Sequence, residues 1–316
     1  MGAWSEDSHP FFILCTLPSV TEKKVVLFLQ QIVNGLIIGG IYALIAVGLT
    51  TIFGLMHVVN FAHGEFYMLG GMIAFIITQS LWGNYFFALI ASIVIVMGIG
   101  FLVEKILIKR FRVAGVDLLV TGALVTIGIS IFFQNTSLLI FGSIPQLISS
   151  PFSTESLRLG PILVGRMYVF AAAVTVVIIL AAHFSIKKTK LGMAMRATFQ
   201  DKDVASLVGV NIDRVYSFTF MLGAGLAATA GALLGPIFVI YPNVGERVVL
   251  KAFVVVILGG MGNFLGAIFA SILLGVVEGL ASAYISAEYK DLIGYVMVLL
   301  ILVFKPSGLF GRMKRI

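Results

Sequence analysis

The longest charged segment of the sequence spans residues 187–214 and reads KKTKLGMAMRATFQDKDVASLVGVNIDR. It carries six basic and three acidic residues and lies between two long apolar runs. Its apolar residues recur at roughly helical intervals, which favours one or two short amphipathic helices outside the bilayer. These residues are Met193, Ala197, Val204, Leu207 and Val208. Such an ordered loop can offer a surface to another protein, or it can simply follow the positive-inside rule.

The composition around this loop is that of a membrane protein. Of the 316 residues, 60% are hydrophobic and 11% are charged, whereas soluble domains carry about 25% charged residues. A soluble chain of this length could not bury so much apolar surface, so we expect an all-α polytopic protein in contact with membrane lipid. The net charge of +7 then reports orientation in the membrane, and we expect no nucleic-acid partner.

Nine apolar segments divide the chain, and the shortest, residues 248–258, would cover only about half a bilayer as a helix. We therefore expect about eight or nine transmembrane segments. The segments are residues 25–53, 65–81, 85–103, 118–141, 167–183, 215–240, 248–258, 264–283 and 292–304. The first could be one long helix or a bent pair, which leaves the side of the N-terminus open.

Basic residues gather in residues 104–117, 187–214 and 305–316, which hold fourteen of the 21 in the chain. The positive-inside rule places all three clusters, and with them the C-terminus, in the cytoplasm. Residues 142–166 then form the largest outward loop.

Two regions interrupt the apolar pattern in a similar way. They are residues 54–71, GLMHVVNFAHGEFYMLGG, and residues 241–266, YPNVGERVVLKAFVVVILGGMGNFLG. Each follows a long apolar segment, carries Asn, Gly and Glu, and re-enters an apolar stretch that ends in a Gly pair. Broken helices at corresponding places in two pseudo-repeated halves indicate a transport pathway. The alternative is that both regions are ordinary loops at the membrane surface.

These regions supply the candidate pathway residues. Glu278 joins them because an intramembrane carboxylate is a functional candidate, although it could equally cap a helix or pair with a partner subunit. The full set is Asn60, His63, Glu65, Tyr67, Gly259, Gly260 and Glu278.

Sequence signatures of catalysis and cofactor binding are missing. There is no P-loop, no G-x-S-x-G, no H-E-x-x-H and no dinucleotide-binding fingerprint. His57 and His63 lack companions at metal-ligand spacing, and the single Cys15 rules out an intrachain disulfide. We therefore expect neither an enzyme nor a bound cofactor or metal.

Four stretches together resemble the LivH-type permease, one of two membrane subunits of branched-chain amino-acid ABC importers. They are residues 34–71, which contain NFAHGE, the loop 191–211, residues 250–267 and the terminal KPSGLFG, residues 305–311. The resemblance covers about residues 28–311, and the family also includes urea and short-amide permeases. The chain departs from it where IKRFR lacks a proline and where Leu265 replaces one.

The resemblance implies a bacterial inner-membrane protein without ATPase activity of its own. Its implied partners are a second permease subunit, two ATP-binding subunits and a periplasmic substrate-binding protein. The second permease could be identical, but the resemblance favours a LivM-like sister. Within residues 187–214, here called the coupling loop, the positions that match the family's ATPase-docking loop are Gly192, Arg196, Ala197, Asp201, Ala205, Gly209 and Asn211.

The expected organisation is thus a variable extension of residues 1–24, one transmembrane permease domain of residues 25–311, and a basic cytoplasmic tail of residues 312–316. The substrate stays open between branched-chain amino acids and urea or short amides. A rival reading is a stand-alone channel or secondary transporter for a small polar solute.

Overall fold

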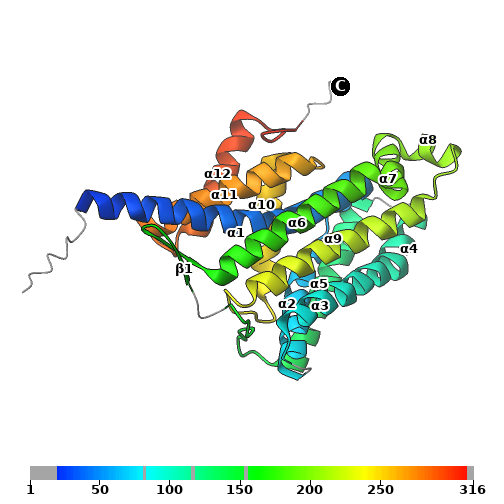
Figure 1. The fold of residues 1–316 in the computed structure, drawn as a ribbon. Coiled ribbons are helices and arrows are strands. Elements are labelled where there is room, and N and C mark those ends of the chain that lie inside the picture. Colours follow the sequence, from blue (N-terminus) through cyan, green and yellow to red (C-terminus); the bar gives the residue numbers. More distant parts are fainter. Residues whose placement is uncertain (1–19, 81–82, 115–117, 153–155, 312–316) are drawn as a thin grey trace, which may run out of the picture.

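The computed structural model describes residues 20–80, 83–114, 118–152 and 156–311. The described chain is mostly helical and forms an elongated bundle with one short β-hairpin (Figure 1). Most of the predicted N-terminal extension, Cys15 and the basic tail of residues 312–316 lie outside the described residues. Residues 20–24 of the predicted extension are the first turn of the first helix.

Six helices are long and apolar enough to cross a membrane. They are α1 (Val20–Met56), α3 (Tyr85–Val103) with its continuation through the π-helix η1 (Glu104–Ile108) and α4 (Lys109–Val113), α5 (Leu118–Phe141), α6 (Arg166–Lys188), α9 (Ile212–Leu234) and α11 (Phe264–Tyr284). The predicted all-α polytopic class agrees with this architecture, whereas the predicted count of eight or nine spans is not confirmed.

The remaining elements are shorter. They are α2 (His63–Ser80), β1 (Ser156–Leu159), β2 (Ile162–Gly165), α7 (Lys190–Gln200), α8 (Lys202–Leu207), α10 (Val244–Gly259) and α12 (Lys290–Phe304). The two strands pair antiparallel, with Ser156 opposite Gly165. The three apolar helices of this group, α2, α10 and α12, fall short of the six spans in length or apolarity.

Helix α1 is one continuous helix of 37 residues, which decides between the long helix and the bent pair. At about 1.5 Å per residue it is roughly 55 Å long, well beyond a hydrocarbon core of about 30 Å. Its N-terminal part lies against the β-hairpin, where Gln30 Nε2 donates to the Leu163 carbonyl at 2.7 Å and Gln30 Oε1 accepts from Leu163 N at 2.9 Å.

Small residues bring the central helices into backbone contact. A Cβ on Gly35 would lie 2.7 Å from the carbonyl oxygen of Gly275, and one on Gly39 would lie 2.7 Å from that of Ser271. These contacts join α1 to α11. Helix α9 lies among α1, α2 and α3, and 83% of its most apolar 18-residue stretch is buried. Close glycine and alanine contacts are how helices associate in lipid, where no hydrophobic effect drives them together.

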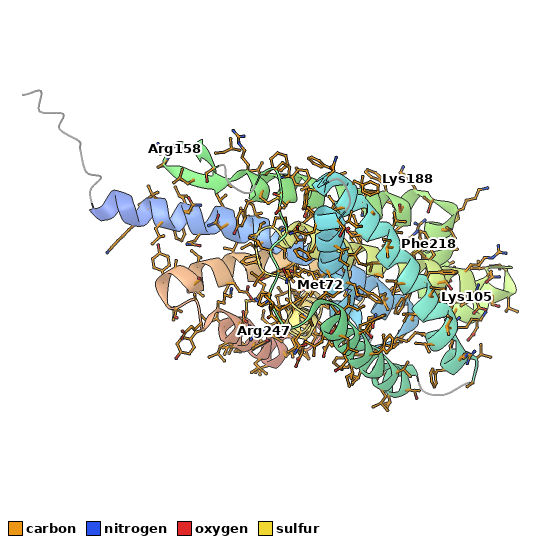
Figure 2. The ribbon with its side chains drawn as sticks, turned by 90° about the horizontal axis from the view of Figure 1, so that it is seen from below. Met72, Lys105, Arg158, Lys188, Phe218 and Arg247 are labelled. Carbon is orange, nitrogen blue, oxygen red and sulfur yellow. The ribbon has the colours of Figure 1, made fainter. Side chains whose placement is uncertain are left out.

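The two ends of the bundle differ in charge and structure. Helices α7 and α8 project at the end where α6 stops and α9 begins, and β1 lies at the opposite end (Figure 1). Lys105 and Lys188 lie toward the first end and Arg158 toward the second (Figure 2). Arg112 joins two basic clusters at the first end, because it donates to Glu104 at 2.8 Å and to Asp213 at 2.6 Å.

Candidate functional site

The coupling loop folds as two short helices whose starts are fixed by side-chain caps. Thr189 Oγ1 accepts from Gly192 N at 2.9 Å and begins α7. Asp201 Oδ1 accepts from Asp203 N at 2.9 Å and begins α8, and Asn211 Oδ1 accepts from Arg214 N at 3.0 Å and begins α9. Capping side chains of this type satisfy backbone N–H groups that the first helical turn leaves free. The predicted short helices are therefore present.

Other predicted loop residues also hold the loop in shape. A Cβ on Gly192 would lie 2.2 Å from the Ile186 carbonyl oxygen, so only glycine allows α7 to pass this close to α6. Arg196 donates to the same carbonyl, and Gly209 adopts a φ of 87°. Ala205 is buried, and Ala197 is half-buried. The residues that match the family's docking loop thus mainly build this loop, and four of them, Arg196, Asp201, Gly209 and Asn211, are also exposed on its surface.

The outer surface of the coupling loop carries apolar side chains among its charged ones. Met193, Val204, Leu207 and Val208 are all exposed, and Leu207 is 86% exposed. The buried face of α7 instead consists of Gly192, Met195 and Thr198. The loop therefore presents, outside the bundle, side chains that would normally be covered.

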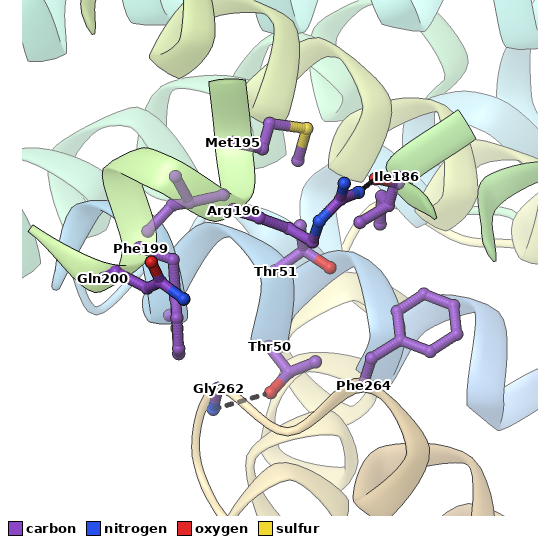
Figure 3. Close-up of a pocket in the computed structure, with 11 residues that line it drawn as sticks. Thr50, Thr51, Ile186, Met195, Arg196, Phe199, Gln200, Gly262 and Phe264 are labelled. Carbon is purple, nitrogen blue, oxygen red and sulfur yellow. Dashed lines mark hydrogen bonds between the residues drawn. The ribbon is translucent and has the colours of Figure 1, made fainter. Parts of the chain in front are cut away.

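A cavity of about 260 Å³ separates α7 from the ends of α1 and α10. Met195, Arg196 and Phe199 line it on the α7 side, facing Thr50 of α1 and Gly262 of the turn after α10 (Figure 3). Gly262 N donates to Thr50 Oγ1 at 2.9 Å, so the turn is fastened to α1. A larger hollow of about 1150 Å³ adjoins it and includes Asp201, Lys202 and Asp203 among its lining residues.

The residues of the first interrupted region lie in the interior of the subunit. Asn60, His63, Glu65 and Tyr67 are each at most 3% exposed. His63 Nε2 lies 3.0 Å from the Ile45 carbonyl oxygen, and Glu65 Oε1 accepts from Ser130 Oγ and Gln134 Nε2, both at 2.9 Å.

Several polar atoms of this group lack a partner within the described parts of the chain. They are both amide atoms of Asn60, His63 Nδ1 and Glu65 Oε2. A buried polar atom without a hydrogen bond costs free energy, so atoms of this kind mark functional or hydrated positions. Asn60, His63 and Glu65 are all fully buried in the described part of the chain.

The two interrupted regions meet at a pair of glycines. A Cβ on Gly64 would lie 2.0 Å from the carbonyl oxygen of Gly245, and one on Gly245 would lie 2.7 Å from the carboxylate oxygens of Glu65. The first turns of α2 and α10 are therefore in backbone contact. Asn243 does not cap α10 with its side chain, and the Glu65 carboxylate lies where the positive end of the α10 dipole favours an anion.

The predicted pathway residues do not form one site. Gly259 and Gly260 lie at the other end of α10, where a Cβ on Gly259 would be 2.5 Å from the Gly266 carbonyl group. Gly260 has a φ of 94°, and Leu309 N donates to the Leu258 carbonyl at 2.8 Å. This glycine pair shapes the turn that touches α1 and α7, well away from Asn60 and its neighbours.

Glu278 belongs to a third group, an ion cluster that joins four helices. Lys251 Nζ lies 3.0 Å from both Glu278 carboxylate oxygens and 2.8 Å from Asp291 Oδ1. Tyr42 Oη donates to Glu278 Oε2 at 3.2 Å. The structure pairs Glu278 with Lys251 of the same chain, which differs from the helix cap and the partner-subunit contact considered from the sequence. The sequence offered a signal for this partner, since Lys251 interrupts an apolar run.

Within the described ranges, no three His, Cys, Asp or Glu side chains lie close enough to hold a metal ion. The fold and these groups define a class of protein: a multi-pass helical membrane protein with a folded, capped loop at its basic end. Residues 31–302 match the family model for the permease component of branched-chain amino acid transport systems, and the chain belongs to that family.

Individual relatives are similar over nearly their whole length. The high-affinity branched-chain amino acid transport system permease protein LivH of Salmonella typhimurium is 36% identical, covering 92% of this chain and 98% of the relative. BraD of Pseudomonas aeruginosa, with the same system name, is 36% identical over 90% and 96%. A probable LivH of Methanocaldococcus jannaschii is 24% identical over 89% and 92%. No solved structure matched the chain.

Proposed function

We propose that this chain is the transmembrane permease subunit of an ATP-binding-cassette importer that moves branched-chain amino acids across the bacterial inner membrane. The observation that carries the proposal is the 36% identity to LivH and BraD over at least 90% of the chain. Urea or short amides are the alternative cargo of the same machine.

Two ATP-binding subunits would drive this transport from the basic end. The exposed Leu207 and Val208 offer them an apolar surface on the coupling loop. The bond of Arg196 to the end of α6, and the contact of Gly262 with α1, would pass a movement of α7 to the spans. Nucleotide can shift the permease between two states only if it binds those states unequally.

The positive-inside rule supports an orientation with the coupling loop and the C-terminus in the cytoplasm. If α2, α10 and α12 also count as crossings, the total is nine, which places the start of α1 and the β-hairpin outside. A periplasmic binding protein would then meet the hairpin end, and a sister permease would pair with this chain. With an odd number of crossings, the start of α1 and the C-terminus lie on opposite sides of the membrane.

The non-helical residues 57–62 and 235–243 would form the breaks of the transport pathway. In support, each leads from a long span into a shorter helix, and the two shorter helices meet at Gly64 and Gly245. Irregular backbone inside a membrane needs protein or a water-filled cavity around it. Broken helices at the interface of two repeats are the usual place for a transporter's substrate.

The test is uptake of labelled leucine and labelled urea by cells that lack the chain, with and without the chain restored. Leucine uptake that returns with the chain supports the branched-chain assignment, and urea uptake that returns instead would replace it. Vesicles that contain the chain alone, without nucleotide, should show no uptake. Transport in those vesicles would favour a stand-alone channel and count against the importer.

A further inference from the structure

A cavity of about 590 Å³ lies at the start of α10, at the end of that helix far from the coupling loop. Pro145 and Leu138 line it from the end of α5 and the loop that follows, and Tyr241, Glu246 and Leu250 line it from the α10 side. The volume lies in the range of about 300–1,000 Å³ typical of small-molecule sites. None of the pathway residues named from the sequence lines this cavity.

Two opposite charges stand side by side in its lining. Glu246 and Arg247 occupy the first turn of α10, and both side chains are exposed. Neither makes an ion pair or a side-chain hydrogen bond with any part of the chain that the structure describes. Adjacent helix positions do not face each other, so the two charges do not neutralise one another well. Lys251, one turn later, is by contrast fully engaged by Glu278 and Asp291.

The place of this pair along the bundle makes the free charges unusual. The start of α10 touches Gly64, and the neighbouring His63 lies beside the carbonyl of Ile45. Ile45 lies roughly 16 Å along α1 from Met56, the last residue of that helix, at about 1.5 Å per residue. This distance is about half the thickness of a hydrocarbon core of about 30 Å. In the proposed orientation, the start of α10 therefore lies inside the membrane. Figure 2 shows Arg247 between the hairpin end, marked by Arg158, and the basic end, marked by Lys105. Ionisable side chains at such depth mark substrate or ion pathways.

We infer that this cavity is the permease's own subsite for the zwitterionic head of an amino acid, with Arg247 receiving the carboxylate and Glu246 the ammonium group. The inference rests on the proposed function and names the part of the chain that reads the substrate. Leu138 and Leu250 supply the apolar wall for an aliphatic side chain.

Physical chemistry favours a zwitterion over a neutral amide at this site. A guanidinium binds a carboxylate through two parallel, charge-assisted hydrogen bonds, and the N-terminal end of α10 adds further attraction for an anion. An amide such as urea carries no net charge at either end and would form no charge-assisted pair with Glu246 or Arg247. The subsite would therefore reject neutral solutes after the binding protein has released them.

The experiment uses the whole importer in proteoliposomes, with the Arg247→Gln and Glu246→Gln variants. Because the binding protein controls capture, the measured quantity is leucine transported per ATP hydrolysed at saturating binding protein. Loss of one charge-assisted pair should lower that ratio about tenfold, with assembly and ATP hydrolysis retained. Arg247→Lys should keep most of the transport, and Arg158→Gln on the exposed hairpin should keep all of it.

A selectivity readout separates recognition from a structural role. In Glu246→Gln, 4-methylpentanoate, which lacks the ammonium group, should inhibit leucine uptake more effectively relative to wild type. In Arg247→Gln, leucinamide, which lacks the carboxylate, should inhibit leucine uptake more effectively than it does in wild type.

Three results would count against the inference or its basis. Wild-type transport of urea and not leucine would overturn the proposed function itself. Wild-type leucine transport with both variants within twofold of it would overturn the subsite alone. Loss of the second permease from either variant would also overturn it, because the charges would then hold two subunits together.

Discussion

At the level of single residues, Gly64 and Gly245 decide how the two halves of the chain meet. Their backbones are in contact, so the side chains that flank them, His63 and Glu65, are held inside the bundle. The contact between Gly64 and Gly245 also fixes the start of α10, and therefore the placement of Glu246 and Arg247. A pair of glycines thus connects the interior polar group to the cavity proposed for substrate.

The variant Gly64→Ala should destabilise the protein by about 2 kcal/mol or more, because a methyl group would meet the fixed backbone oxygen of Gly245. Thermal unfolding in detergent measures the effect. Gly98→Ala and Gly128→Ala are matched controls in α3 and α5, where a Cβ meets nothing within 4 Å. Both controls should be neutral or slightly stabilising, since alanine favours helix by up to about 1 kcal/mol. Equal stability of Gly64→Ala and the controls would contradict the contact.

Lys251 and Glu278 form an ion pair. Removing only one of the two charges should destabilise the protein more than removing both. Lys251→Met leaves the Glu278 carboxylate, whose side chain is 7% exposed, next to Asp291 without its cation. Breaking a buried ion pair in this way costs about 3–5 kcal/mol. The double variant Lys251→Met with Glu278→Gln should recover part of that loss, because it removes the uncompensated charge. Additive losses in a denaturant series would show that the two side chains are not coupled.

At the level of elements, the coupling loop contains residues that hold α7 and α8 in place, such as Arg196 and Asp201, and exposed apolar residues that make no such contact. Reversing the charges of Arg196 and Asp201 would remove the tie to Ile186 and the cap of α8 at once. Such a variant tests the loop's structure together with its docking. The exposed apolar residues are a cleaner probe of docking alone.

The variant Leu207→Glu should sharply reduce co-purification of the ATP-binding subunits, because a carboxylate would replace an apolar side chain that is 86% exposed and needs a dry partner surface. Helix content measured by circular dichroism should not change. Lys202→Gln on the same short helix is the control and should leave co-purification intact. Undiminished recovery of the ATPases with Leu207→Glu would place the docking surface elsewhere.

The cap at Asp201 predicts a different outcome. Asp201→Ala removes the acceptor for two backbone N–H groups at the start of α8 and should cost about 1 kcal/mol of local stability. Hydrogen exchange of α8 amides should quicken, while Asp201→Asn should retain most of the protection because an asparagine side chain also caps. Unchanged exchange in the alanine variant would contradict this role.

At the level of the whole molecule, the opposite positions of the hairpin and the coupling loop predict sidedness. In a chain with Cys15→Ser, Arg158→Cys should react with an impermeant thiol reagent from outside the cell. Lys188→Cys should react only after the membrane is opened. Both side chains are exposed and lie at opposite ends (Figure 2). Reaction of both from the same side would refute the proposed orientation.

Much of the helical framework could be predicted from hydropathy. The bounds of α3 and α5 agree with the apolar segments at residues 85–103 and 118–141. Helix α1 extends beyond its apolar segment because nothing in residues 20–24 breaks a helix. The span count was harder to predict, since α10 has 16 residues and helix length alone does not say how deep a helix lies in lipid.

The sequence by itself determined the class of protein and the short helices of the coupling loop, because apolar run length and helical periodicity are set by neighbouring residues. It also carried the family, through motifs that extend along most of the chain. Only the tertiary structure decided that Gly64 meets Gly245, that Lys251 neutralises Glu278, and that Glu246 and Arg247 stay free beside a cavity. Such contacts depend on how distant helices pack, and no local pattern of residues encodes that packing.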